Sequence, residues 1–187
     1  NPVRQAALKL SIPVAEINVS KNATAGEFSL FDTSSDISLP SENTEALVLH
    51  TSGTTSRPKV VPLTQGNIVA SAGNISNTLK LSEADHSLNI MPLFHIHGLI
   101  AVLCASLYSG SSICCTPGFN ALKFFDLATS EKITWYSGVP TMHQAILLRG
   151  QRQVDAAKAL KLRFIRSSSA SLPPAVFEEL ADLFNCP

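Results

Sequence analysis

A run of hydroxyl-bearing residues that ends in lysine carries the strongest chemical signal in this sequence. Residues 51–59 read Thr-Ser-Gly-Thr-Thr-Ser-Arg-Pro-Lys. Gly53 lets the backbone turn and approach an oxygen closely, the hydroxyls can donate hydrogen bonds, and Lys59 can offset negative charge. The pattern therefore favours a polyphosphate ligand, although the P-loop of NTPases would need a second glycine beside the lysine. An ordinary polar surface loop is the alternative interpretation.

Two short apolar runs flank this loop and must position it. Residues 46–50 precede the loop, residues 60–63 follow it, and both runs have the length of a strand. Thr64 stands at the start of a helical pattern over 65–80, where it can act as the N-cap. We therefore expect the loop to join two strands, the second of which leads directly into a helix.

The rest of the chain alternates short apolar runs with amphipathic segments. Strands are predicted near 87–91, 111–116, 133–137 and 161–166, and helices over 98–108, 120–131, 140–149, 152–160 and 173–184. This order predicts an α/β fold, with alternating strands and helices around a largely parallel sheet.

The first part of the chain has a different character. Residues 3–10 have a helical pattern and residues 12–19 a strand pattern, and a polar linker follows with one edge strand around 28–31. We therefore expect residues 1–45 to form a partial helix and strand plus the linker, and residues 46–187 to form one larger domain piece.

Composition limits the classes of protein to which the chain can belong. Hydrophobic residues make up 45% of the 187 residues and charged residues 15%, which indicates a globular piece with a sizeable core. Lys+Arg and Asp+Glu are equal at 14 each, so no charge excess favours nucleic acid or an anionic membrane. The apolar stretch 98–108 is too short to span a bilayer. The four cysteines, which include Cys114 and Cys115, fit no metal-ligating spacing, and we interpret them as reduced, buried thiols of an intracellular protein.

Two further motifs follow the loop. Residues 91–99 read Met-Pro-Leu-Phe-His-Ile-His-Gly-Leu, and residues 166–172 read Arg-Ser-Ser-Ser-Ala-Ser-Leu. With the loop, they resemble the motifs of the adenylate-forming enzymes, the superfamily of acyl-CoA synthetases, luciferases and peptide-synthetase adenylation domains. The resemblance covers nearly the whole chain and is greatest to oxalate–CoA ligases and related short dicarboxylate synthetases. Ser56 and Val60 stand where that family usually has glycine.

The resemblance implies ATP-dependent activation of a small carboxylic acid, oxalate or a similar dicarboxylate, to an acyl-adenylate and then to a CoA thioester. The cofactors would be ATP, Mg²⁺ held through its phosphates, and CoA as co-substrate. Lys59 would be catalytic, and the residues that would hold ATP are Thr51, Ser52, Gly53, Thr54, Thr55, Ser56 and Lys59. The chain would be a fragment of the large N-terminal domain, without the C-terminal domain and inactive alone, from a protein of the cytoplasm or peroxisome.

The resemblance also places an acyl pocket in this chain. His95 would be catalytic and contact the acid, while Ser168, Ser169 and Ala170 would form a polar wall. His97 is the one titratable side chain that we place beside a second carboxylate. Each histidine has a structural alternative, as a satisfied core residue or as a residue packed against a helix start. Alternate residues of a strand share a face, but the His95 and His97 pair has no evident third ligand, so no protein-bound metal is expected.

Two other functions stay open. A medium-chain or aryl acyl-CoA synthetase would use the same motifs, although His97 and the serines at 167–169 weigh against a long apolar tail. A non-catalytic module that binds a nucleotide or a protein partner would share the loop without the reaction. Pyrophosphate exchange with a panel of acids would separate the three.

Overall fold

The computed structural model describes residues 2–14, 17–20, 22, 29–30, 39–51 and 58–186. The chain divides into two compact units, Asn1–Leu39 and Pro40–Pro187. In the first unit, helix α1 (Pro2–Lys9) is followed by strands β1 (Ile17–Asn18) and β2 (Ser29–Leu30), which pair antiparallel. The predicted helix and edge strand are confirmed. The strand predicted over 12–19 is much shorter, and Pro13 within it has no N–H to donate to a partner strand.

The second unit begins with a hairpin that holds both ends of the 51–59 loop. Strand β3 (Glu45–Thr51) pairs antiparallel with β4 (Lys59–Thr64), as the flanking apolar runs predict. The Oγ1 of Thr64 accepts from the backbone N–H of Asn67 at 3.2 Å, and the Oδ1 of Asn67 accepts from the Thr64 N–H at 3.1 Å. This reciprocal cap begins helix α2 (Gln65–Leu79), which confirms Thr64 as the N-cap.

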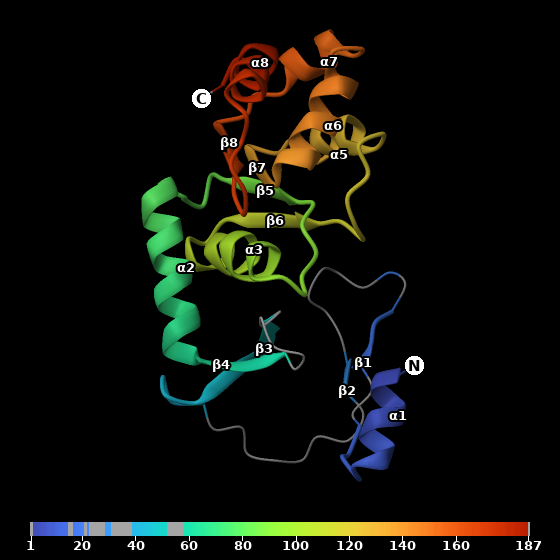
Figure 1. The fold of residues 1–187 in the computed structure, drawn as a ribbon, viewed down its shortest axis with the longest axis vertical. Helices are drawn as coiled ribbons and strands as arrows, with labels where there is room; N and C mark the ends of the chain where they lie inside the picture. The colour runs from blue at the N-terminus through green and yellow to red at the C-terminus, as the bar shows by residue number, and fades with distance from the viewer. Residues whose placement is uncertain are drawn as a thin grey trace. The chain divides into compact units, whose positions relative to one another are not determined.

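A four-stranded parallel sheet forms the centre of the second unit, in the order β6-β5-β7-β8. Its strands are β5 (His86–Asn89), β6 (Ser112–Cys115), β7 (Trp135–Gly138) and β8 (Phe164–Ser167). One side carries α5 (Phe124–Ser130), α6 (Pro140–Gly150), α7 (Val154–Ala159) and α8 (Pro174–Phe184). On the other side lie α2 and the consecutive segments α3 (Ile96–Gly98), η1 (Leu99–Cys104, π-helical) and α4 (Ala105–Tyr108) (Figure 1). The predicted α/β alternation and largely parallel sheet are confirmed.

The two faces of the sheet differ because side chains alternate along each strand. Leu88 and Tyr136 belong to an apolar core that includes residues of α5, α6 and α8. On the opposite face Ser87 bonds Ser106, with 3.1 Å between their Oγ atoms, and the Asn89 Nδ2 donates to the Gly98 carbonyl at 3.1 Å. The helix segment 96–108 is therefore bonded to polar side chains on this face of the sheet.

The prediction that the four cysteines are reduced, buried thiols is confirmed only in part. All four thiols are free, and Cys186 is buried, but Cys115 is exposed and Cys104 and Cys114 are half-buried. Cys115 ends strand β6, which lies at the edge of the sheet, so no further strand of this sheet covers it. In the part of the chain that the structure describes, no helix has both the length and the apolar character needed to cross a bilayer.

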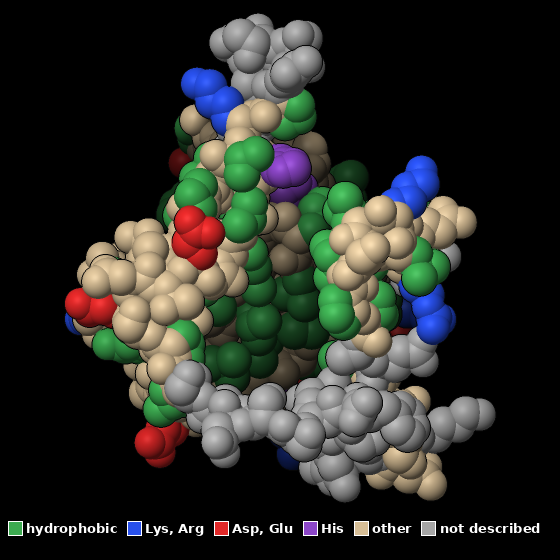
Figure 2. All heavy atoms as spheres, turned by 90° about the horizontal axis from the view of Figure 1, so that it is seen from below, with side chains coloured by type: hydrophobic (Ala, Val, Ile, Leu, Met, Phe, Trp, Pro, Cys, Tyr) green, Lys and Arg blue, Asp and Glu red, His purple; other side chains and the backbone are tan. Residues whose placement is uncertain are grey.

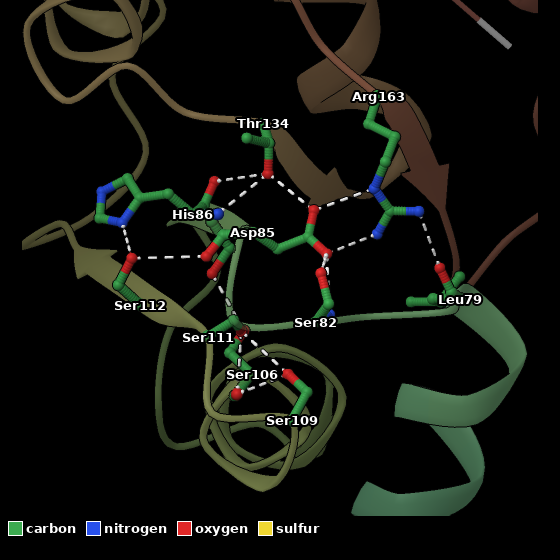
Figure 3. Close-up of polar contacts among 11 residues, drawn as sticks. Leu79, Ser82, Asp85, His86, Ser106, Ser109, Ser111, Ser112, Thr134 and Arg163 are labelled. Carbon is green, nitrogen blue, oxygen red and sulfur yellow. Dashed lines mark hydrogen bonds and ion pairs between the residues drawn. The ribbon is translucent and has the colours of Figure 1, made fainter.

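A buried carboxylate joins four elements at the start of the parallel strands (Figure 3). Asp85 is 3% exposed and accepts hydrogen bonds from Arg163 at 2.8 and 2.9 Å, from the Ser82 N–H at 3.0 Å and from the Thr134 hydroxyl at 2.9 Å. Arg163 also donates to the carbonyl of Leu79 at 3.1 Å. Burial alone would raise the pKa of Asp85, but these hydrogen bonds and the Arg163 charge hold it below the ordinary value of an aspartate.

We expect Asp85→Asn to lower the free energy of unfolding by about 2 kcal/mol, because it weakens charge-assisted bonds in a buried site. Urea denaturation, followed by fluorescence of the one tryptophan, buried Trp135, measures this loss. The Asp85 pKa is lower in the folded state, so its contribution is present above the unfolded pKa and disappears as pH falls through the folded one. Exposed Asp182→Asn is the matched control, and equal effects of the two changes would contradict this role.

Candidate functional site

The hairpin brings the two ends of the predicted phosphate loop together. Thr51 and Lys59 are paired residues at the end of β3 and the start of β4. The Lys59 side chain is exposed, so an anionic ligand can reach its ammonium group. The other predicted ATP-binding residues, Ser52, Gly53, Thr54, Thr55 and Ser56, lie outside the described residues. Their assignment to ATP stays a prediction.

A pocket of about 340 Å³ lies between α2, the helix segment 96–108 and the end of β8. Its walls are largely apolar and include Leu63, Ile68, Ile75, Ile100 and Ala101. Polar side chains from three separate stretches of the chain also line it, namely Asn67, Ser71, His97, Arg166, Ser168 and Ser169. Three of the predicted substrate-binding residues, His97, Ser168 and Ser169, are thus brought together.

His97 lies in the first turn of the helix segment 96–108 and is 6% exposed. Its Nε2 is 2.7 Å from the Ser137 Oγ, and its Nδ1 is 3.1 Å from the Ser169 Oγ. Burial, with the nearby Arg166 and His143, lowers the pKa of His97 to about 4. His97 is therefore neutral near pH 7 and can offer a hydrogen bond but no charge.

Arg166 decides which nitrogen of His97 carries the proton. The Arg166 Nη1 lies 3.3 Å from the His97 Nε2, and a cation beside this nitrogen favours its lone pair over a proton. The Nδ1–H then donates to Ser169, Nε2 accepts from the Arg166 Nη1, and the Ser137 hydroxyl donates to the Arg166 carbonyl at 3.2 Å. Both imidazole nitrogens are satisfied in the neutral ring.

Arg166, which was not among the predicted site residues, also lines the pocket, so His97 is not the one titratable side chain there. Arg166 lies in β8 beside Ser137 of β7. It donates from Nη1 to the Ser137 Oγ at 3.1 Å and from Nη2 to the Ser168 Oγ at 3.4 Å. Burial lowers the pKa of Arg166, although a guanidinium stays charged in proteins. Its place at the carboxyl end of a predicted parallel strand was the available signal, because ligand sites form there.

The turn that follows β8 contributes two serines, Ser168 and Ser169, to the lining of the pocket. Ser169 has a φ of 73°, a left-handed conformation that favours glycine, and its hydroxyl contacts His97. Ala170 is exposed and does not line the pocket, so the structure separates it from Ser168 and Ser169.

His95 is separated from His97. It is exposed, packs against the Phe94 ring with centroids 4.5 Å apart, and is not part of the pocket lining. Its backbone is extended, with φ −109° and ψ 142°, while His97 is already helical. The two histidines are therefore not alternate residues of one strand, and the catalytic role of His95 stays a prediction.

Apolar side chains are exposed beside this site. Leu93, Phe94 and Ile96 are each at least 43% exposed, and Ile96 also lines the pocket. Figure 2 shows hydrophobic side chains in the middle of the view, while the Lys, Arg, Asp and Glu side chains lie toward its edges. Such a concave, mostly apolar site with a few convergent polar groups is typical of small-molecule binding.

Known proteins are similar to this chain in sequence and in fold. The chain is 40% identical over 193 residues to the oxalate–CoA ligase of Arabidopsis thaliana, a match that covers 100% of this chain and 37% of the relative. It is 42% identical over 166 residues to the oxalate–CoA ligase of Saccharomyces cerevisiae, covering 89% of this chain and 28% of the relative. A malonyl-CoA ligase solved with methylmalonyl-CoA and AMP superposes with a TM-score of 0.70 at 28% identity, over 78% of this chain and 32% of that one.

The chain thus spans about a third of the length of these relatives. The model of one family, described as AMP-binding enzyme, matches residues 3–187. The β3–β4 hairpin, the parallel sheet and the pocket at the end of β8 all lie within that range, and the chain belongs to the family of AMP-binding enzymes.

Proposed function

We propose that a complete protein carrying this chain activates a small carboxylic acid, oxalate or a similar short dicarboxylate, with ATP and transfers it to CoA. The oxalate–CoA ligase relatives and the malonyl-CoA ligase neighbour support this proposal. The observation that carries it is the polar end of the pocket, where His97, Ser168 and Ser169 converge around Arg166.

The reaction has two steps. The carboxylate attacks the α-phosphorus of ATP, pyrophosphate leaves, and the CoA thiol then attacks the acyl carbon and releases AMP. The first step brings an anion against a polyanion, so the site must supply positive charge and hydrogen-bond donors. Lys59 and the hydroxyls of the 51–59 loop would supply them. Mg²⁺ would bind through the phosphates, since the described residues contain no group of three or more His, Cys, Asp or Glu side chains that could hold a metal ion.

The size of the pocket favours a second candidate, a medium-chain or aryl acyl-CoA synthetase. A volume of about 340 Å³ with walls from Ile68, Ile75 and Ile100 has room for much more than two carboxylates. In that case the apolar wall would hold the body of the acid, and the polar end would contact only its carboxylate.

A panel of acids separates these candidates in the complete protein. We expect oxalate or malonate to give the highest kcat/KM for acid-dependent pyrophosphate release. A preference for octanoate or benzoate would support the second candidate. Pyrophosphate release with none of these acids would leave a module that binds a nucleotide or a partner without catalysis.

Lys59→Ala tests the phosphate-loop assignment. Loss of one charge-assisted contact to phosphate should cost about 1.5–3 kcal/mol of transition-state binding, a roughly 10- to 150-fold lower kcat/KM for ATP. Adenylate formation at subsaturating ATP measures the change. Lys158→Ala, at an exposed position of α7, is the control. If the two variants form adenylate equally fast, Lys59 does not contact the phosphates.

A further inference from the structure

Arg166 is a half-buried cation whose charge is not neutralised by the part of the chain that the structure describes. Its bonds from Nη1 and Nη2 go to Ser137, Ser168 and the imidazole of His97. The ion pairs among the described residues join Asp85 to Arg163 and His86 to Glu131, so no described carboxylate pairs with Arg166. These neutral partners satisfy donors but do not offset the charge. A charge removed from water in this way is costly unless a counter-ion accompanies it.

The same guanidinium lies where a ligand can reach it. Arg166 lines the pocket of about 340 Å³ together with His97, Ser168 and Ser169. Strand β8 fixes its backbone, and Ser137 on the neighbouring strand accepts from it at 3.1 Å. A guanidinium presents several donors in one plane, which matches the two oxygens of a carboxylate. The arrangement thus offers a preformed set of donors for an anion in a pocket whose walls are largely apolar.

We propose that Arg166 determines specificity by binding a second anionic group of the acid, a carboxylate or sulfonate, while the hydroxyls of Ser168 and Ser169 add hydrogen bonds and neutral His97 holds Ser169 in place. This inference rests on the proposed function and changes one part of it. The charge complementary to the second anion comes from Arg166, and His97 serves as a hydrogen-bonding neighbour. The substrate class is therefore a short acid that carries two negative charges.

Ser137 is a positioning residue in this subsite. It is fully buried, and its hydroxyl contacts the Nε2 of His97 at 2.7 Å and the Nη1 of Arg166 at 3.1 Å. One side chain therefore sets the distance between the cation and the imidazole. It would not touch the acid itself.

The test compares Arg166→Met with wild type in the complete protein. We expect the ratio of kcat/KM for malonate to that for butyrate to fall at least tenfold, which corresponds to about 1.4 kcal/mol. Butyrate has no second anion, so its kcat/KM reports any general damage. Arg166→Lys keeps the charge but loses the planar guanidinium, and its malonate-to-butyrate ratio should lie between those of wild type and Arg166→Met. Arg152→Met, at an exposed position outside the pocket, is the control.

The pH dependence separates Arg166 from His97. With His97 neutral beside Arg166 and His143, the malonate-to-butyrate ratio should stay constant between about pH 7 and 8.5. A cationic His97 would lose its charge over this range, and the ratio would fall as pH rises. Such a fall would overturn the assignment to Arg166.

A binding measurement keeps the inference independent of catalysis. Calorimetric titration with malonate should show at least tenfold weaker binding to Arg166→Met than to wild type, with butyrate unchanged. If no acid supports pyrophosphate release, the proposed function fails, and this binding difference alone decides the role of Arg166. Arg166→Gln, which can still donate to the serines, replaces the methionine variant if that variant does not fold. A malonate-to-butyrate ratio and a malonate affinity within twofold of wild type would overturn the inference.

Discussion

Tyr136→Ala is expected to lower the free energy of unfolding by about 3–5 kcal/mol, the range for removing a large buried aromatic side chain. Tyr136 is fully buried at the centre of the apolar core. Its ring lies 4.9 Å from that of Phe124 and 6.5 Å from that of Phe184, both in edge-to-face geometry. Because β7 lies between two other strands, the sheet cannot close the cavity without distortion. Urea denaturation followed by Trp135 fluorescence and by circular dichroism measures the loss.

Tyr136→Phe is the matched control, since it removes only the hydroxyl. That hydroxyl lies 3.2 Å from the His143 Nδ1, and the His143 Nε2 lies 3.2 Å from the Gly138 carbonyl, so a neutral imidazole with its proton on Nε2 satisfies both contacts. Loss of the Tyr136 hydroxyl should lower the free energy of unfolding by about 1–2 kcal/mol. If alanine proved no more destabilising than phenylalanine, the ring would not be part of the packed core that stabilises the sheet.

Gly98→Ala should lower the free energy of unfolding by about 3 kcal/mol, because the added methyl group overpacks the site and forces the backbone to shift. A Cβ at this position would lie 2.6 Å from the Pro92 carbonyl oxygen and 2.9 Å from that of Met91, and neither backbone atom can rotate away. The Gly98 carbonyl also accepts from Asn89, so a shift would break a buried bond between the helix segment 96–108 and the sheet. His97 immediately precedes it, and acid selectivity should change with stability.

Gly118→Ala gives the contrasting control. An added Cβ there would meet no atom within 4 Å, so we expect the free energy of unfolding to change by no more than about 0.5 kcal/mol. Thermal unfolding of both variants tests stability, and the malonate-to-butyrate ratio tests the site. If both glycine variants had wild-type unfolding and selectivity, close packing at Gly98 would not hold His97 in place.

Local patterns determined much of this fold. The Thr64 cap uses a side chain and a backbone only three residues apart, and the strands on both sides of the 51–59 loop form a hairpin whose pairing is local in sequence. The alternation of apolar runs and amphipathic helices likewise predicts a parallel sheet, because each strand must cross over through a helix. These features depend on residue type and spacing within short segments, so they could be predicted from the sequence.

Contacts between residues that are distant in the sequence determined how the side chains are arranged around the pocket. Arg166 meets Ser137 and His97 across 29 and 69 positions of the chain, and only the strand register and the position of the helix segment 96–108 bring them together. The two histidines of the 91–99 motif separate because the backbone changes from extended to helical between them. Burial then lowers the pKa of His97 to about 4 and leaves the charge to Arg166. The family resemblance predicted that His97, Ser168 and Ser169 would share a pocket, but which side chain carries a charge there depends on desolvation and packing in the folded chain.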